Sequence, residues 1–193
     1  MKKNKIILVG TSPIVEYHVK ALKKADFEII AVASSNTNSA SHKIFAKKNI
    51  IKKSYSNWKE MMNKEKYDGI VIATRTESTI EILEYAIKQN IPILVEKPIS
   101  FNSKDIKKII SKSHKMIMVG YNRRFYKTIN SVKNLISEEE NPILASMITP
   151  ELSNMKDFFN NTSHSLDILR YIFGEIKLTY VKKLIINNVQ KGF

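Results

Sequence analysis

The stretch Ile6-Ile7-Leu8-Val9-Gly10-Thr11-Ser12-Pro13 decides the fold of the first part of the chain. Its apolar run has no polar alternation, which is typical of a strand that is buried on both faces. Gly10 ends the run, and Pro13 suits the first turn of a helix that continues to Lys24. The stretch therefore predicts the first strand and helix of a right-handed βαβ unit.

The same alternation continues to about residue 120. Further strands are predicted at residues 27–33, 50–51, 69–73, 93–95 and 116–119. Helices are predicted at residues 13–24, 39–48, 57–64, 78–88 and 103–111, with Ser56 as the N-cap of the third. Strands that alternate with helices predict an α/β fold, a six-stranded doubly wound parallel sheet of the Rossmann type over residues 1–120. Such sheets bind ligands at the C-terminal ends of their strands.

The pattern changes after Gly120. Helices are predicted at residues 126–136 and 162–173, the second closed by Gly174, and strands at residues 143–148 and 178–186. We interpret residues 121–193 as a partial α/β second domain, a truncated domain for substrate binding and dimerisation. A partial sheet leaves an exposed edge and an apolar face, so we expect a homo-oligomer.

Composition excludes several classes of protein. The chain of 193 residues carries a net charge of +14, but its lysines are scattered singly or in pairs, which favours a solvated basic surface over a specific nucleic-acid partner. No apolar run approaches the roughly 18–20 residues of a membrane helix. The absence of cysteine excludes disulfides and thiolate-bound zinc, and no metal site is predicted. We expect a soluble cytoplasmic protein without a membrane partner.

The loop after the first strand is a thinned version of the G-x-G-x-x-G phosphate loop. Only Gly10 is kept, while Ser12 and Val15 stand at the positions of the second and third glycines. The helix N-terminus still offers free N–H groups and the positive end of the helix dipole. We therefore predict that a dinucleotide contacts this loop, at Gly10, Thr11, Ser12, Pro13 and Ile14.

The end of the second strand bears on the choice of cofactor. An acidic residue here would bind the ribose 2′-hydroxyl of NAD. The chain has Ser34-Ser35-Asn36 instead, which removes the repulsion against a 2′-phosphate, although no arginine follows nearby. Ser34 and Ser35 are predicted to contact the cofactor. The prediction is NAD or NADP, with NADP slightly favoured.

Four later segments carry a family resemblance. They are Asp68-Gly-Ile-Val-Ile-Ala-Thr74, Ile91-Pro-Ile-Leu-Val-Glu-Lys-Pro98, Val119-Gly-Tyr-Asn-Arg-Arg-Phe125 and His164-Ser-Leu-Asp-Ile-Leu-Arg-Tyr-Ile-Phe-Gly-Glu175. In this order and spacing the chain resembles the glucose–fructose oxidoreductase / inositol dehydrogenase family (Gfo/Idh/MocA). The resemblance covers about residues 4–175.

The resemblance implies hydride transfer between nicotinamide and an alcohol carbon of a sugar, nucleotide sugar or cyclitol. It implies that Lys97 hydrogen-bonds the reacting hydroxyl and the nicotinamide ribose, where its charge would stabilise a developing alkoxide. His164 would be the general base. Glu96 and Thr74 would line the cofactor cleft, and Arg124 would meet cofactor or substrate.

Some positions depart from the family pattern. Arg75 stands where the family usually has proline, so its guanidinium could reach a phosphate or simply be exposed. Asn160 and Asn161 stand where the family often has an aspartate before the histidine, and an amide cannot stabilise an imidazolium as a carboxylate would. The chain is also shorter than family members. These departures keep open an alternative: a catalytically impaired Rossmann protein that binds a nucleotide or a partner. The histidines at 18, 42 and 114 have no partner in any motif and are interpreted as structural, although the register of His18 agrees with the family pattern.

Overall fold

The computed structural model describes residues 2–112, 115–138, 144–149, 158–182, 184–186 and 189–192. The chain forms two compact units, Met1–Gly120 and Tyr121–Phe193. In the described part of the chain, no helix combines the length and the apolar character needed to cross a bilayer.

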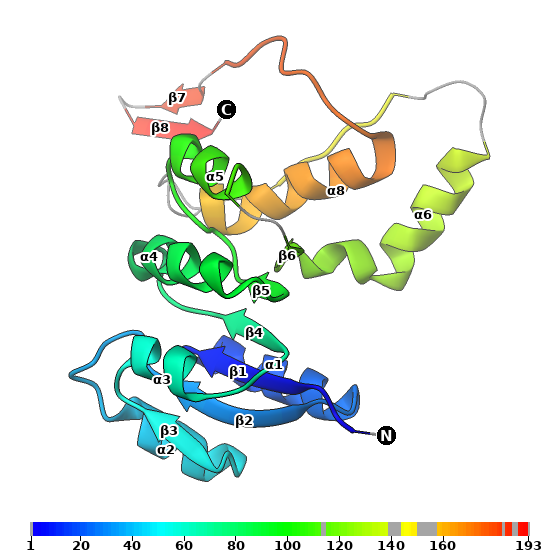
Figure 1. Ribbon diagram of the computed structural model, residues 1–193. Coiled ribbons are helices and arrows are strands. Elements are labelled where there is room, and N and C mark those ends of the chain that lie inside the picture. Colours follow the sequence, from blue (N-terminus) through cyan, green and yellow to red (C-terminus); the bar gives the residue numbers. More distant parts are fainter. Residues whose placement is uncertain are drawn as a thin grey trace. The chain divides into compact units, whose positions relative to one another are not determined.

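The first unit is built on a six-stranded parallel sheet with the strand order β3-β2-β1-β4-β5-β6 (Figure 1). This order confirms the predicted doubly wound fold. Val9 pairs with Ala33 on one side and with Ile72 on the other, so the ends of three strands are level at one edge of the sheet. The strands are β1 (Lys5–Val9), β2 (Glu28–Ala33), β3 (Lys53–Tyr55), β4 (Gly69–Ile72), β5 (Ile93–Val95) and β6 (Ile117–Val119).

Helices cover both faces of this sheet. Ile7 and Val9 of β1 point to a cluster that includes residues of α3, α4 and α5, while Leu8 points to a second cluster with residues of α1 and α2. Burial on both faces is the reason why the strands are continuous apolar runs. The helices are α1 (Pro13–Lys24), α2 (Ser41–Asn49), α3 (Trp58–Lys64), α4 (Thr76–Ala86) with the 3-10 turn η1 (Ile87–Gln89), and α5 (Ser103–Ile110).

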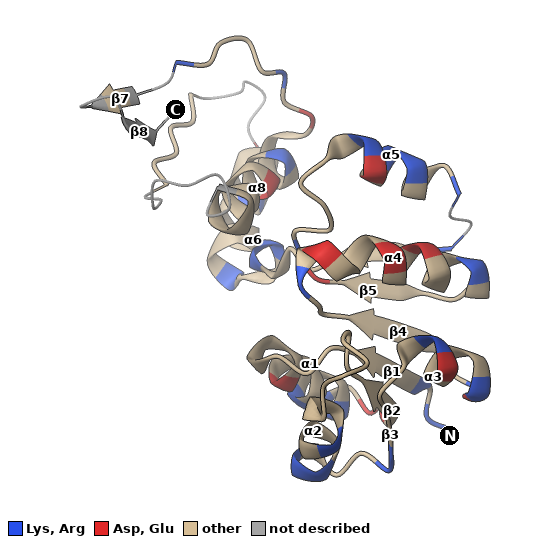
Figure 2. Ribbon diagram, turned by 90° about the vertical axis from the view of Figure 1, so that its left-hand side faces the viewer, with Lys and Arg blue, Asp and Glu red and all other residues tan. Residues whose placement is uncertain are grey.

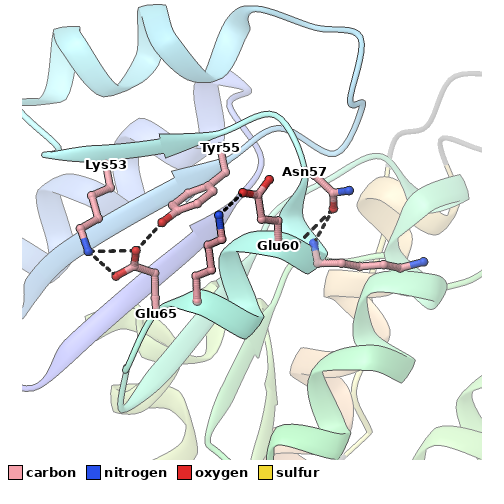
Figure 3. Close-up of polar contacts among 7 residues, drawn as sticks. Lys53, Tyr55, Asn57, Glu60 and Glu65 are labelled. Carbon is pink, nitrogen blue, oxygen red and sulfur yellow. Dashed lines mark hydrogen bonds and ion pairs between the residues drawn. The ribbon is translucent and has the colours of Figure 1, made fainter.

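Two predictions for the third strand and helix are wrong in detail. Residues 50–51 do not form a strand: Ile50 ends α2 in a left-handed conformation with φ of 57°, and the strand begins at Lys53. The N-cap of α3 is Asn57 rather than Ser56, because the Asn57 side chain accepts hydrogen bonds from the N–H groups of Lys59 and Glu60 (Figure 3).

Side-chain contacts hold both ends of α3 (Figure 3). Asn57 caps its start, and just beyond its last turn Glu65 accepts hydrogen bonds from Lys53 at 2.8 Å and from Tyr55, both on β3. The Lys53–Glu65 ion pair places an almost fully buried carboxylate against an exposed ammonium. The segment that follows β3 is therefore fixed against the edge of the sheet.

The second unit contains helices and a two-stranded antiparallel sheet. Helix α8 (Ser163–Phe173) ends at Gly174, as predicted, and the φ of 82° at Gly174 suits a residue without a side chain. Residues 144–149 carry no strand, which corrects the strand predicted at 143–148; residue 143 lies outside the described residues. Among the described residues of the strand predicted at 178–186, which exclude residue 183, only Leu184–Ile186 form a strand. The elements are η2 (Asn122–Phe125), α6 (Lys127–Ser137), the π-helical turn η3 (Phe158–Thr162), α8 (Ser163–Phe173), β7 (Leu184–Ile186) and β8 (Val189–Gly192).

Candidate functional site

A polar pocket of about 850 Å³ lies in the first unit, where β1, β2 and β4 end. In a doubly wound sheet this is the point where successive crossovers leave β1 in opposite directions, and ligands bind there. The lining residues come from the three loops that follow these strands and from the starts of α2, α3 and α4. They are Gly10, Thr11, Ser12, Ser34, Ser35, Asn36, Thr37, Ser39, Ser41, Asn57, Trp58, Lys59, Ala73, Thr74, Arg75, Glu77, Ser78 and Glu81.

Gly10 is the residue at which a side chain is excluded. Its φ is 121°, and a Cβ there would lie 2.1 Å from the carbonyl oxygen of Ala73. The Gly10 N–H donates to Ala33 O at 2.8 Å, and the Ala73 N–H donates to Val9 O at 2.8 Å. The first glycine of the loop is therefore required because three strand ends converge around its backbone.

The helix that follows this loop starts without a side-chain cap. Ser12 is the N-cap of α1 in extended backbone geometry, and its side chain makes no capping hydrogen bond. The first N–H groups of a helix lack partners within it, so they are available to an anion. Gly10, Thr11 and Ser12 line the pocket, whereas Pro13 and Ile14 are exposed residues of the first turn of α1 and are not part of the lining.

Hydroxyl groups dominate the β2 side of the pocket. Thr11 Oγ1 lies 2.8 Å from Ser41 Oγ, which accepts from Ser39 Oγ at 2.9 Å. Ser34, which is buried, donates to the carbonyl oxygen of Asn36 at 2.7 Å, while Ser35 lines the pocket beside it. This side of the pocket thus combines hydrogen-bond donors with an absence of carboxylates at the end of β2.

Carboxylates enter the lining from the other side, on α4. They are Glu77 and Glu81, and Figure 2 shows the acidic stretches of this helix in red. Glu81 pairs with Lys59 of α3 at 2.8 Å, and both side chains are well exposed. Arg75 is the N-cap of α4 and is exposed. Lys59 and Arg75 are the cations among the residues that line the described pocket.

Thr74 is fixed by a short hydrogen-bond chain. Its Oγ1 lies 2.9 Å from Thr79 Oγ1, and Thr79 donates to the carbonyl oxygen of Arg75 at 3.0 Å. Thr79 is buried, so the turn after β4 is tied to the second turn of α4. These two hydrogen bonds fix the position of the Thr74 side chain in the lining of the pocket.

Glu96 and Lys97 follow β5, outside the residues that line this pocket. The Glu96 carboxylate lies 2.8 Å from His18 Nε2 and accepts the Lys97 N–H at 3.3 Å. The Lys97–Pro98 peptide bond is cis. His18 therefore has a partner that the sequence pattern did not reveal. His42 Nδ1–H donates a hydrogen bond to the carbonyl oxygen of Ser39 at 2.9 Å, and His114 lies outside the described residues.

The charge state of Glu96 follows from two opposed effects. Burial acts to raise the pKa of the carboxyl. The hydrogen bond and charge of His18, with the amide and charge of Lys97, outweigh burial and hold the pKa of Glu96 below its ordinary value. Glu96 is therefore a carboxylate at neutral pH.

The second unit carries the other predicted site residues on α8 and η2. His164 is buried, and the Tyr121 ring meets it edge-on with 5.6 Å between ring centroids. Arg124 is held by a bidentate pair with Asp167, with Nε 2.6 Å from Oδ2. Arg123 donates to Asn161 Oδ1 at 2.7 Å, so this amide oxygen is engaged by an arginine.

The structure thus groups the predicted residues in three places. The pocket brings together Gly10, Thr11, Ser12, Ser34, Ser35, Thr74 and Arg75. Glu96 and Lys97 lie together after β5, and His164 and Arg124 belong to the second unit. Sequence reasoning missed the contributions of α3 to the pocket, the His18–Glu96 pair and Asp167. For Asp167 the signal was its place one helical turn after His164, on the same face of α8.

The strand order and the polar pocket at its switch point define the class: a doubly wound dinucleotide-binding fold. The profile of the Gfo/Idh/MocA family, described as an oxidoreductase family with an NAD-binding Rossmann fold, matches residues 4–121. The chain belongs to this family.

Curated relatives and solved structures agree with this assignment. The chain is 24% identical over 185 residues to myo-inositol 2-dehydrogenase of Thermotoga maritima, covering 89% of this chain and 55% of the relative. It is 21% identical to an inositol 2-dehydrogenase of Salmonella paratyphi B, covering 87% and 54%. The chain therefore spans about half the length of the curated relatives it matches.

Solved structures share the fold. An Agrobacterium radiobacter oxidoreductase, crystallised with NAD+, L-tartaric acid and magnesium, superposes with a TM-score of 0.82 at 20% identity, covering 99% of this chain and 60% of that one. A Lactobacillus casei myo-inositol dehydrogenase, in complex with NAD(H) and myo-inositol, gives a TM-score of 0.74 at 18% identity, covering 89% and 54%.

Proposed function

We propose that this protein is an NAD(P)-dependent oxidoreductase that acts on a secondary alcohol of a sugar, nucleotide sugar or cyclitol. The observation that carries the proposal is the polar pocket at the C-terminal ends of β1, β2 and β4. Family membership supports the cofactor class, and relatives named as inositol dehydrogenases support a polyol substrate.

The residues of the pocket fit a dinucleotide. Its volume of about 850 Å³ lies within the roughly 300–1,000 Å³ of ligand sites. Gly10 keeps the first loop free of a side chain where the backbone is most crowded. The uncapped start of α1 supplies N–H groups for the pyrophosphate, with the Thr11 and Ser12 hydroxyls beside it.

When bound, oxidised NAD(P) would supply the hydride acceptor. In the proposed oxidation of an alcohol to a ketone, the cofactor would take the hydride of the carbinol carbon, and an imidazole nitrogen of His164 would take up the hydroxyl proton. The Lys97 ammonium would donate a hydrogen bond to the hydroxyl oxygen and stabilise its developing negative charge. His164 is proposed as general base because the family resemblance places the active-site histidine there and because imidazole is the side chain used most often for general base catalysis.

We propose NADP as the slightly preferred cofactor. Ser34, Ser35 and Asn36 place no carboxylate at the end of β2, so a 2′-phosphate meets no repulsion there. Hydroxyl donors at Ser39 and Ser41 line the same side of the pocket. NAD remains the alternative. The cations that line the pocket, Lys59 and Arg75, lie on α3 and at the N-cap of α4 and not on the β2 side, where a 2′-phosphate would lie.

The test is a titration of the purified chain with NADH and with NADPH, followed by nicotinamide fluorescence. The proposal predicts saturable binding of both, tighter for NADPH. Ser35→Asp should shift the preference towards NADH by about tenfold, which corresponds to the energy of one charge-assisted hydrogen bond. The control variant Ser35→Ala should leave the preference unchanged. Absence of binding at millimolar cofactor would contradict the proposal.

A second function has its own supporting observation. Asn161 carries an amide where the family often has an acid, and its oxygen is engaged by Arg123. A nucleotide-binding protein with impaired catalysis would bind NADPH as tightly but reduce no ketone, and replacing Asn160 or Asn161 with aspartate would raise turnover. A screen of polyols with wild type and both variants separates the two functions.

A further inference from the structure

Three segments of the first unit meet at the Glu96 carboxylate. From α1, His18 Nε2 lies 2.8 Å from Glu96 Oε1. From the turn after β5, the Lys97 N–H donates to Glu96 Oε2 at 3.3 Å. From the end of β6, Gly120 approaches so closely that a Cβ there would lie 2.9 Å from the carboxylate carbon. One oxygen of Glu96 thus holds α1, and the other holds the backbone of Lys97.

The His18–Glu96 pair is shielded from solvent. Each side chain is 16% exposed. A carboxylate that has lost most of its water needs hydrogen-bond donors, and it orders the groups that provide them. The charged groups that act on Glu96 are His18 from α1 and Lys97 from its own turn. Loss of either donor would leave the carboxylate to turn or to take up a proton.

We propose that His18 is a positioning residue for Lys97. It fixes the Glu96 carboxylate, which in turn fixes the backbone from which the Lys97 side chain starts, and Gly120 provides the space in which the carboxylate sits. This proposal rests on the proposed function of Lys97 at the cofactor, and it adds a residue 79 positions earlier in the chain whose effect is indirect.

A purely structural role for His18, tying α1 to the sheet, makes a different prediction. It would lower stability without a specific effect on Lys97. The two roles are separated by a double-mutant cycle, because residues that act through one another show non-additive losses.

The first experiment measures NADPH affinity for the full chain and for His18→Leu, Lys97→Ala and the double variant. The proposal predicts that His18→Leu weakens binding by about tenfold in the wild-type background, the worth of one hydrogen bond to a charged group. It predicts no further loss in the Lys97→Ala background. Additive losses would overturn the proposal. His18→Gln, which keeps an N–H donor, should retain most of the affinity.

The second experiment needs no cofactor. The backbone amide signal of Lys97 in a ¹⁵N–¹H NMR spectrum reports the ionisation of Glu96, to which it donates. In wild type, the titration midpoint should lie below 4.5, and His18→Leu should move it upward because burial then acts with less opposition. An unchanged midpoint would overturn the link between His18 and the Lys97 backbone.

Two further variants keep the test decisive. Gly120→Ala pushes the carboxylate without removing a polar group, so it should displace the Lys97 amide signal even if His18→Leu does not fold. Glu16→Gln, which removes the exposed ion pair between Glu16 of α1 and Lys48 of α2, should leave that signal unchanged. If wild type binds no NADPH, the proposed function fails, while the amide titration still decides whether His18 acts on Lys97.

Discussion

The two units of the chain bury different kinds of side chain. In the described residues of the first unit, burial is mainly apolar and forms one cluster on each face of the sheet. In those of the second unit, the buried side chains lie on α8 and are mostly polar: His164, Ser165 and Asp167, with Ile168. Apolar burial stabilises a fold, whereas buried polar groups must be held by partners and often serve chemistry. The apolar core of the first unit is therefore a scaffold that carries the polar pocket, and the buried face of α8 is a separate candidate site in the second unit.

The largest expected effect is the loss of a core side chain from the scaffold. Leu8 is fully buried, whereas Leu178 is 78% exposed. Leu8→Ala should lower the free energy of unfolding by about 3 kcal/mol, and Leu178→Ala by less than about 0.5 kcal/mol. Urea unfolding followed by the fluorescence of Trp58, the single tryptophan, measures the first unit. Equal losses of stability in the two variants would show that the burial of Leu8 does not stabilise the first unit.

The next effect compares two glycines with positive φ. A Cβ at Gly10 would lie 2.1 Å from the Ala73 carbonyl oxygen, while a Cβ at Gly174 would meet open space. Gly174→Ala should cost only backbone strain, about 1–3 kcal/mol. Gly10→Ala adds a backbone clash, so it should cost more and should also weaken NADPH binding. Thermal unfolding and cofactor titration check both, and unaltered binding by Gly10→Ala would contradict the assigned pocket.

A smaller effect concerns two neighbouring arginines of η2. Arg124 pairs with the buried Asp167, whereas Arg123 bonds to the exposed Asn161. Arg124→Leu leaves a buried carboxylate without its donor and should cost about 1–3 kcal/mol, against less than about 0.5 kcal/mol for Arg123→Leu. Amide hydrogen exchange along α8 is the measurement. If both variants leave α8 equally protected, the polar burial does not stabilise the second unit.

The smallest effect is a dependence of stability on pH. Burial of Glu96 acts to raise its pKa, but the hydrogen bond from His18 and the other favourable contacts together hold the folded pKa below its ordinary 4.5. A carboxyl with a lowered folded pKa contributes stability above its unfolded pKa, and this contribution is lost as pH falls through the folded value. Glu96→Gln should therefore reduce the acid-side loss of stability below pH 4.5. Identical pH profiles, measured by urea unfolding, would show that Glu96 makes no such contribution.

Much of the scaffold could be predicted from the sequence because buried parallel strands are continuous apolar runs. The exception is instructive. Ile50 and Ile51 suggested a strand by composition, but Ile50 closes a helix and is 87% exposed. The strand that forms, Lys53–Tyr55, is a short edge strand with little apolar content, so periodicity does not reveal it.

The sites were less predictable because their pairs are distant in the chain. Loops after strands pointed to Gly10, Ser35 and Thr74, since topology gathers the C-terminal ends of parallel strands at one edge. His18 and Glu96, by contrast, lie 78 residues apart, and no local spacing indicates that they pair. The catalytic roles of Lys97 and His164 stay predictions, because they depend on groups that only a bound cofactor and substrate supply.

A dinucleotide bound at the C-terminal ends of β1, β2 and β4 would change the environment of the loops that follow these strands. Chemical-shift mapping of the ¹⁵N-labelled chain with NADPH detects such a change. The largest shifts should fall at the amides of Gly10, Ser35 and Thr74. Changes confined to the cavity at the opposite strand ends, around Tyr67 and Gln89, or no changes at millimolar NADPH, would contradict binding at this site.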